Sequence, residues 1–296
     1  MIRKVIAWYR RPNKSWFADL IETLIVFIPL AFLIRTFFYG LYRVPSGSME
    51  TRLLVGEFFV SDKLTPWFTA FKRGDIIAFN APNYDYSDNS VKNWWQRYVW
   101  GPENWTKRII GIPGDHVEGK IEEGHPVIYL NGEKLDEPYV NIYPLLPIWP
   151  NGVPTRQELY AGEAILKCKP YVYVSYDKSK PFNQQPFYTI NPELVDMSGI
   201  LPVREPGTAI PEDVFDIQLG DNEYFVLGDN RLGSGDCRFE SYFPGHKLDG
   251  KLIHGKIRFR LFSVDSRENW FLLDPIKHPI DFWKRVRWSR CMQTVS

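Results

Sequence analysis

Two serines separated by a single glycine, in the segment VPSGSMETRLLVGE, have the residue types and spacing of a catalytic nucleophile. Pro45 favours an extended or turn backbone, and Gly47 can adopt conformations that other residues resist. This arrangement suits the presentation of one hydroxyl, that of Ser48, and one backbone N–H to a carbonyl group. The same PSGS pattern is common in surface turns, so this segment alone does not assign a catalytic role.

A serine nucleophile needs a base to accept its proton, and Lys107 is the lysine best suited to that role. No G-x-S-x-G elbow is present, and the five histidines stand in no obvious triad setting, although folding could assemble one. If NWTKRIIGIPGD is a strand, Trp105, Lys107 and Ile109 share one face, where burial favours a neutral amine. Lowering the pKa of a lysine by about 3 units from roughly 10.4 costs about 4 kcal/mol. The alternative is a lysine at a strand edge that keeps its charge in water.

A third segment, EYFVLGDNRLGSGDCRFESYFPG, joins a short apolar strand to a polar loop. Such loops hold their side chains by mutual hydrogen bonds and ion pairs, here among Asp229, Arg231, Asp236 and Arg238. The alternatives are a solvated hairpin loop and an acidic calcium-binding loop. The two arginines argue against calcium, which prefers oxygen ligands.

The element that positions Ser48 is an apolar run, which predicts a membrane-spanning helix over 19–42. About 20 residues at 1.5 Å each cross a hydrocarbon core of roughly 30 Å, and Arg35 can extend its charge to the interface. An extended chain then places Ser48 within roughly 20 Å of the end of the span. Basic residues precede the run and predict a cytoplasmic amino end: Arg3, Lys4, Arg10, Arg11 and Lys14. A buried core helix is the main alternative, since the bulky exit FFYGLY disfavours a cleaved signal peptide.

Composition excludes several other classes of function. A net charge of +1 with no basic stripe predicts no nucleic-acid partner. The three cysteines match no zinc spacing, and we expect neither a metal nor an organic cofactor. Whether Cys168 and Cys237 pair is left open. Aromatic residues make up 16% of the chain, which suits either a membrane interface or a β-rich core.

Together, the segments resemble type I signal peptidase (bacterial leader peptidase), a serine protease family with a Ser/Lys dyad. Four motifs carry the resemblance, in order: PSGSM at 45–49, KRGDI at 72–76, KRIIGIPGD at 107–115 and GDNRLGSGDCR at 228–238. The resemblance implies that Ser48 is the nucleophile and Lys107 the general base. It also implies an oxyanion hole made by Ser46 and the Ser48 N–H, and a Ser234 hydroxyl that orients the lysine. Further residues would brace the site: Asp229, Arg108, Asp236 and Arg238.

The family's fold, as the resemblance implies it, is mostly β: a coiled antiparallel sheet behind a single transmembrane helix. We expect a cytoplasmic stub (1–18), the span (19–42) and an extracytoplasmic peptidase domain (43–296), with an accessory β subdomain inserted at 141–210. This sequence departs from the family pattern at one point. In the family, a variable residue, Pro and Thr usually follow the nucleophile and Met. Here the run is Glu50, Thr51, Arg52, which puts the local turn and the nearby pocket in doubt.

The activity implied is removal of signal peptides from exported preproteins after small residues (A-x-A), at the outer face of the bacterial cytoplasmic membrane. Partners would be preproteins and the lipid bilayer. Candidate pocket walls are Val44, Ser46, Leu53, Thr106 and Ile110. Two alternatives remain: a specialised processing peptidase of the same clan, of conjugation or pilin type, and a catalytically inactive membrane-anchored binding module.

Local patterns predict further elements. VIYLNGEKLDEPYV at 127–140 is typical of a hairpin with Asn131-Gly132 at the turn, and alternation from Ile257 to Leu261 indicates a strand. The stretch 91–105 holds Trp94, Trp95, Trp100 and Trp105. It could dip into the bilayer beside the active site, assisted by Trp67 and Phe68, or form a covered core strand.

Overall fold

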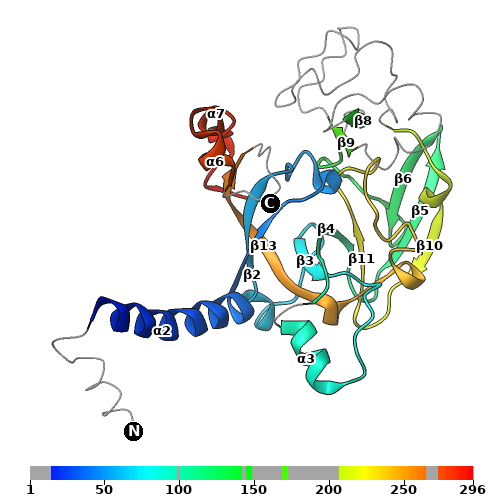
Figure 1. Cartoon of the computed structure of the whole chain (residues 1–296). Coiled ribbons are helices and arrows are strands. Elements are labelled where there is room, and N and C mark those ends of the chain that lie inside the picture. The colour runs from blue at the N-terminus through cyan, green and yellow to red at the C-terminus, as the bar shows by residue number, and fades with distance from the viewer. Residues whose placement is uncertain are drawn as a thin grey trace, which may run out of the picture.

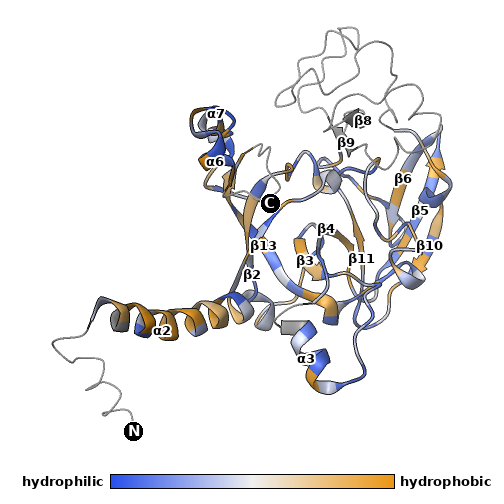
Figure 2. Ribbon diagram, viewed as in Figure 1, coloured by the Kyte–Doolittle hydropathy of each residue, from blue (hydrophilic) through white to orange (hydrophobic). Residues whose placement is uncertain are grey.

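The structure is a computed structural model that describes residues 15–98, 101–141, 145–148, 169–172, 207–264 and 273–295. Its first element is helix α2, Trp16–Phe37, which contains Pro29. Within α2, Leu20–Phe37 is long and apolar enough to cross a membrane. The helix projects away from the rest of the chain and is hydrophobic along most of its length (Figures 1 and 2). These features fit the predicted membrane anchor.

The helix ends earlier than the sequence predicts. Strand β1 spans Tyr39–Arg43, and its first four residues are ones that we placed in the span. Tyr39 lies opposite Asp62 and Arg43 opposite Phe58 of strand β2 in an antiparallel pair. The apolar run therefore serves two elements, because its last residues gain sheet hydrogen bonds that hydropathy alone does not reveal.

Antiparallel strands form the main sheet, which confirms the mostly β fold class. In the described part of the chain this sheet has eight strands, in the order β1-β2-β13-β3-β4-β11-β12, with β14 paired to β13. Figure 1 shows the sheet curling around on itself. Its strands are β1 Tyr39–Arg43, β2 Glu57–Asp62, β3 Ile76–Asn80, β4 Asn104–Gly111, β11 Glu223–Leu227, β12 Leu248–Asp249, β13 Ile253–Ser263 and β14 Gln293–Thr294. The strand predicted at Ile257–Leu261 is confirmed as part of β13.

A second, smaller sheet packs beside the first, in the order β10-β5-β6-β7. Its strands are β5 His116–Glu122, β6 His125–Leu130, β7 Glu133–Lys134 and β10 Phe215–Gln218. The hairpin with Asn131-Gly132 at its turn is confirmed, since both residues have positive φ and join β6 to β7. These strands lie on either side of the predicted insertion 141–210. Within that insertion, strands β8 (Leu145–Ile148) and β9 (Lys169–Val172) pair, and most of the remainder lies outside the described residues.

The tryptophan-rich stretch divides between a helix and a strand, because its last residue, Trp105, lies on β4 and packs against the core, as the covered-strand alternative expected. Helix α3 spans Ser90–Tyr98, and the Asn89 side chain caps it by accepting hydrogen bonds from the amides of Val91 and Lys92. Trp94 and Trp95 are exposed on α3. Trp100 lies outside the described residues. For this helix, the alternative that remains is a surface that dips into the bilayer.

Two apolar clusters form most of the core. The larger contains side chains of both sheets, including Phe79, Ile110, Val117 and Phe225. The smaller packs Met49 and Leu53 against Phe59 and Ile257. Near the carboxyl end, the short helices α6 (Asp274–Lys277) and α7 (Pro279–Lys284) pack through Phe282 against Val264 and Val286.

Candidate active site

Ser48 lies in a short 3₁₀ turn, η1 (Gly47–Met49), that follows β1. The preceding backbone is extended at Ser46, whose φ and ψ are −138° and 160°. The following side chain, Met49, is buried in the smaller core cluster. This anchor holds the turn from one side, while Ser48 itself stays partly exposed. The nucleophile candidate is thus fixed by its neighbour's packing and remains accessible.

Lys107 reaches Ser48 from the centre of the main sheet. It lies on β4, opposite Ile77 of β3, and is 4% exposed. Its Nζ is 3.1 Å from Ser48 Oγ. The structure therefore brings together the two residues that the sequence proposed as nucleophile and base, although they are 59 positions apart.

Burial changes the acidity of this lysine. The pKa of Lys107 is lowered from 10.5 to about 8, because desolvation, aided by the Arg238 charge, outweighs the opposing effects of Asp236, Cys237 and Asp229. At pH 7 a pKa of about 8 leaves ~9% of the amine neutral, compared with ~0.03% for an unperturbed lysine. A neutral amine can accept the proton of a serine hydroxyl.

Asn230 holds the nucleophile turn, a role that sequence reasoning missed. Its side-chain amide donates to the Gly47 carbonyl at 3.0 Å, and its backbone N–H donates to the Ser48 carbonyl at 3.1 Å. Asn230 is 1% exposed. Its place directly after Asp229 in the GDN segment was the available signal, but nothing local indicates that it faces residue 47.

Arg108 and Asp229 form a buried pair beside the dyad. Two guanidinium nitrogens of Arg108 donate to the two carboxylate oxygens of Asp229, at 2.8 and 2.7 Å. A third donates to the Gly74 carbonyl at 2.8 Å, which ties in the KRGDI segment. The guanidinium also lies 4.1 Å from the centre of the Tyr139 ring. Such bidentate pairing fixes the loop after β11 against β4.

Asp236 and Arg238 form a second buried pair on the same loop. Arg238 Nε donates to Asp236 at 2.8 Å, and Arg238 Nη1 donates to Asp213 at 2.8 Å. Asp236 also accepts the Gly228 N–H at 3.1 Å. Although burial raises the pKa of Asp236, the Arg238 charge and these hydrogen bonds bring it below its usual value. The four residues expected to brace the site are therefore close to it and paired.

Ser234 is placed near the dyad but does not make the expected contact. It is buried, and its Oγ has no hydrogen-bond partner among the described residues. The expected bond from Ser234 to Lys107 is therefore not formed in this structure. Ser234 and the Ser48 carbonyl both pack closely against Gly228. A Cβ at that position would lie 2.2 Å from Ser234 Oγ and 2.5 Å from the Ser48 carbonyl oxygen. Ser46 is exposed, and its side chain makes no capping hydrogen bond.

The expected pocket walls belong to different parts of the core. Val44 and Leu53 belong to the smaller core cluster, whereas Ile110 belongs to the larger one. Thr106 is half-buried, and its carbonyl accepts a hydrogen bond from Lys107 Nζ at 3.2 Å. A cavity of about 140 Å³ lies elsewhere, between the second sheet and the loop that carries Arg231 and Arg238.

The segment that departs from the family pattern is held by the far end of the chain. Arg290 donates to the carbonyls of Thr51 and Arg52, at 3.2 and 3.0 Å. Arg260 also donates to the Arg52 carbonyl, at 3.1 Å. Both arginines pair with Glu57, which is fully buried. These bonds restrain the turn where a proline would otherwise do so.

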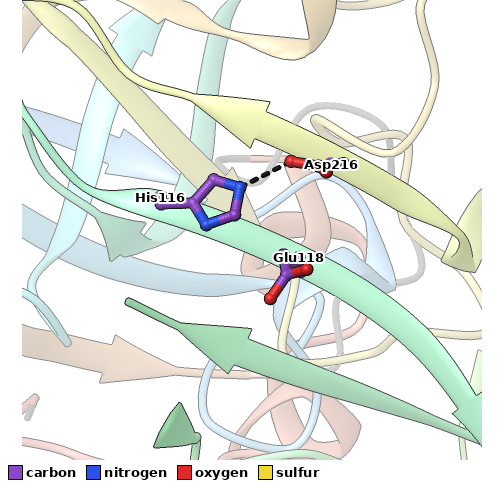
Figure 3. Close-up of side chains that lie close together, drawn as sticks. All are labelled: His116, Glu118 and Asp216. Atoms are coloured by element: carbon purple, nitrogen blue, oxygen red, sulfur yellow. Dashed lines mark hydrogen bonds and ion pairs between the residues drawn. The ribbon is translucent and has the colours of Figure 1, made fainter. Parts of the chain in front are cut away.

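His116, Glu118 and Asp216 form a group of metal-ligand residue types on the second sheet (Figure 3). His116 Nε2 lies 2.5 Å from Asp216, and Glu118 already pairs with Lys120 at 3.1 Å. Asp216 is 74% exposed. We interpret the group as a surface ion-pair network, and its sheet is not the one that carries the dyad.

The cysteines lie in separate environments. Cys237 is buried and free, and its sulfur accepts the Val226 N–H at 3.3 Å. Burial raises the pKa of its thiol well above the usual value. Cys291 is also free, and Cys168 lies outside the described residues.

Comparison with known proteins yields one consistent family. The model of the family "Signal peptidase, peptidase S26" matches residues 17–262. A probable signal peptidase I-2 of Synechocystis is 32% identical over 152 residues, which is 51% of this chain and 62% of that protein. Signal peptidase I of Bacillus amyloliquefaciens is 25% identical over 226 residues, covering 76% of this chain and 80% of that protein.

A solved structure is also similar, a signal peptidase I from Enterococcus faecalis V583. It is 19% identical and covers 64% of this chain and 97% of that one. Its TM-score of 0.27 is too low for the superposition to add to the fold assignment.

Proposed function

Because this chain belongs to the signal peptidase family, peptidase S26, and is a serine endopeptidase of that family, we propose that it removes signal peptides by a Ser48–Lys107 dyad. The observation that carries the proposal is the 3.1 Å distance between Ser48 Oγ and a lysine amine that is 4% exposed. A surface lysine would hold its proton and could not act as a base at neutral pH.

In the first step, the neutral amine of Lys107 accepts the Ser48 hydroxyl proton as Oγ attacks the scissile carbonyl carbon. The ammonium then gives that proton to the departing amine, which leaves an ester between Ser48 and the signal peptide. A water molecule, deprotonated by the same amine, hydrolyses the ester and restores the serine.

The developing oxyanion needs hydrogen-bond donors. We assign this role to the Ser48 N–H, which lies in the first turn of η1. The N–H groups of a first helical turn have no carbonyl acceptor within the helix and can therefore bind an oxyanion. The exposed Ser46 hydroxyl would be the second donor. Asn230 supports the assignment, since it donates to the Gly47 and Ser48 carbonyls and so orients the Ser48 N–H that lies between them. Ser234 would orient Lys107 through its buried hydroxyl, which has no hydrogen-bond partner among the described residues.

The substrates would be preproteins exported across the bacterial cytoplasmic membrane and cut after small residues in an A-x-A pattern. The apolar helix supports a span, and the basic residues before it support a cytoplasmic amino end with the catalytic domain outside. No metal or organic cofactor has a part in this scheme. An inactive binding module is disfavoured by the proximity of the two dyad residues.

The test is cleavage of one A-x-A preprotein by the full chain in detergent. Ser48→Ala and Lys107→Ala should each lower the rate at least about a thousandfold. Lys120→Ala is the matched control, because Lys120 is an exposed lysine on β5. Processing that persists in the Ser48→Ala protein would refute the mechanism. Rescue of a strain lacking general signal-peptide cleavage would distinguish this function from that of a specialised processing peptidase.

A further inference from the structure

Two basic residues, Arg35 and Lys63, lie near each other where helix α2 joins the main sheet. Arg35 lies in the last turn of α2, and the Phe38 N–H closes the following turn by donating to the Ile34 carbonyl at 2.9 Å. The Phe38 carbonyl in turn accepts the Lys63 N–H at 2.9 Å. Lys63 therefore lies beside the turn that carries Arg35, although it comes from the far side of the hairpin of β1 and β2.

No described residue neutralises these two cations. Neither charged group forms an ion pair or hydrogen bond with a described side chain, and Lys63 Nζ lies 5.8 Å from the centre of the Tyr42 ring. The neighbouring carboxylate, Asp62, is already engaged by Leu64, Thr65 and Arg258. Burial, followed by the positive charge of Arg35, lowers the pKa of Lys63 from 10.5 to about 8. Two cations therefore lie near each other, and no described side chain pairs with either of them.

Their position identifies the missing anion. The 22 residues of α2, at 1.5 Å each, span about 33 Å, so the last turn lies at the level of the lipid headgroups. The 3₁₀ turn η2 (Thr65–Trp67) follows Lys63 and exposes Trp67 and Phe68, at 66% and 78%. Exposed aromatic residues beside a span are typical of the membrane interface. Phosphate groups at this level would lie within reach of both cations.

We propose that Arg35 and Lys63 together bind the phosphate of one anionic phospholipid headgroup at the membrane surface. This inference rests on the proposed span, and it concerns neither the dyad nor the peptide substrate. Arg35 contributes from the helix and Lys63 from the catalytic domain. One bound phosphate would therefore restrain the domain relative to the helix, and so set the height of Ser48 above the bilayer.

Native mass spectrometry of the full chain in non-ionic detergent tests the site with two lipids of the same acyl chains. Palmitoyl-oleoyl phosphatidylglycerol should bind more tightly than the corresponding phosphatidylcholine. Arg35→Gln and Lys63→Gln should each weaken binding of the first phosphatidylglycerol about fivefold, as expected for one basic residue at an anionic surface. Arg35→Lys and Lys63→Arg keep the charge and should stay within about twofold. Lys120→Gln, a loss of the same charge on β5, should change nothing.

Three results would overturn the proposal: equal affinity for both lipids, equal loss in the Lys120→Gln control, or complete displacement of phosphatidylglycerol by inorganic phosphate at matched ionic strength. A measurement on the unaltered chain guards against variants that fold poorly. Carbon-13 NMR of reductively methylated protein should report a higher pKa for Lys63 in phosphatidylglycerol than in phosphatidylcholine, and an unchanged pKa would contradict the site. Because none of these readouts is peptidase activity, failure of the proposed function would not imitate failure of this inference.

Discussion

The acidity of Lys107 predicts how the activity depends on pH. Only the neutral amine can accept the Ser48 proton, so kcat/KM should follow the deprotonated fraction of Lys107. Burial lowers the pKa of Lys107 to about 8. The neutral fraction therefore rises with pH, from ~1% at pH 6 through one half at about pH 8 to ~90% at pH 9.

The assay is hydrolysis of a fluorogenic A-x-A peptide without ionisable side chains, by the full chain in detergent between pH 6 and pH 10. We expect kcat/KM to rise about tenfold per pH unit below pH 8 and to level off above it. Between pH 6 and the plateau the total rise is about a hundredfold. Circular dichroism at each pH checks that the fold is unchanged over this range.

The control for this profile is Cys237→Ser. Cys237 is one of the buried titratable groups that act on Lys107, and the pKa of its thiol is raised well above the usual value. A serine keeps an acceptor for the Val226 N–H, so the acidic limb should stay at the same pH. A limb that is absent between pH 6 and pH 9, or that moves in the Cys237→Ser protein, would refute the assignment of Lys107 as the base.

Three further substitutions test the packing around the dyad. In Lys107→Met the buried cation is lost, so the free energy of unfolding at pH 7 should rise by about 3 kcal/mol, measured by denaturant titration with tryptophan fluorescence. The pKa of Lys107 is lower in the folded than in the unfolded state, so the stability of the wild-type protein rises between about pH 8 and 10.5. The advantage of Lys107→Met over the wild type should therefore disappear across this range. In Asn230→Ala the donor to Gly47 is lost, and kcat should fall about tenfold with KM within about twofold. In Arg290→Ala the buried Glu57 keeps fewer cationic partners, and the free energy of unfolding should fall by about 2 kcal/mol.

The asparagine and arginine substitutions each have a control of the same chemistry, and the pH dependence is the control for Lys107→Met. Asn222→Ala removes an amide that bonds to the exposed Asp249 and should leave kcat unchanged. Arg73→Ala removes an arginine that is 46% exposed and should cost less stability than Arg290→Ala. A stability gain in Lys107→Met that does not depend on pH would argue against a charged, buried lysine. An equal loss of kcat in both asparagine variants would remove the positioning role from Asn230.

Local patterns in the sequence determined the parts of the fold that depend on near neighbours. The Asn131-Gly132 turn was predictable because its two positive φ angles suit these residue types. The strand within β13 was predictable from alternation, and the apolar helix from the length of its run. The end of that helix was not predictable, because residues 39–42 continue the apolar run and become part of a strand only by pairing with β2. Helix α3 was missed because the cap at Asn89 outweighed the aromatic content of the segment.

The chemistry of the site divides in the same way. Single segments made Ser48 and Lys107 candidates only, and the resemblance of four motifs in order to the family assigned their roles. Only the tertiary structure decided that their side chains meet at 3.1 Å, that Asn230 holds the serine turn and that Arg290 restrains Thr51. Each of these contacts joins residues far apart in the chain. The pKa of Lys107 is also a property of the fold, since strands from distant segments must first remove water from its amine.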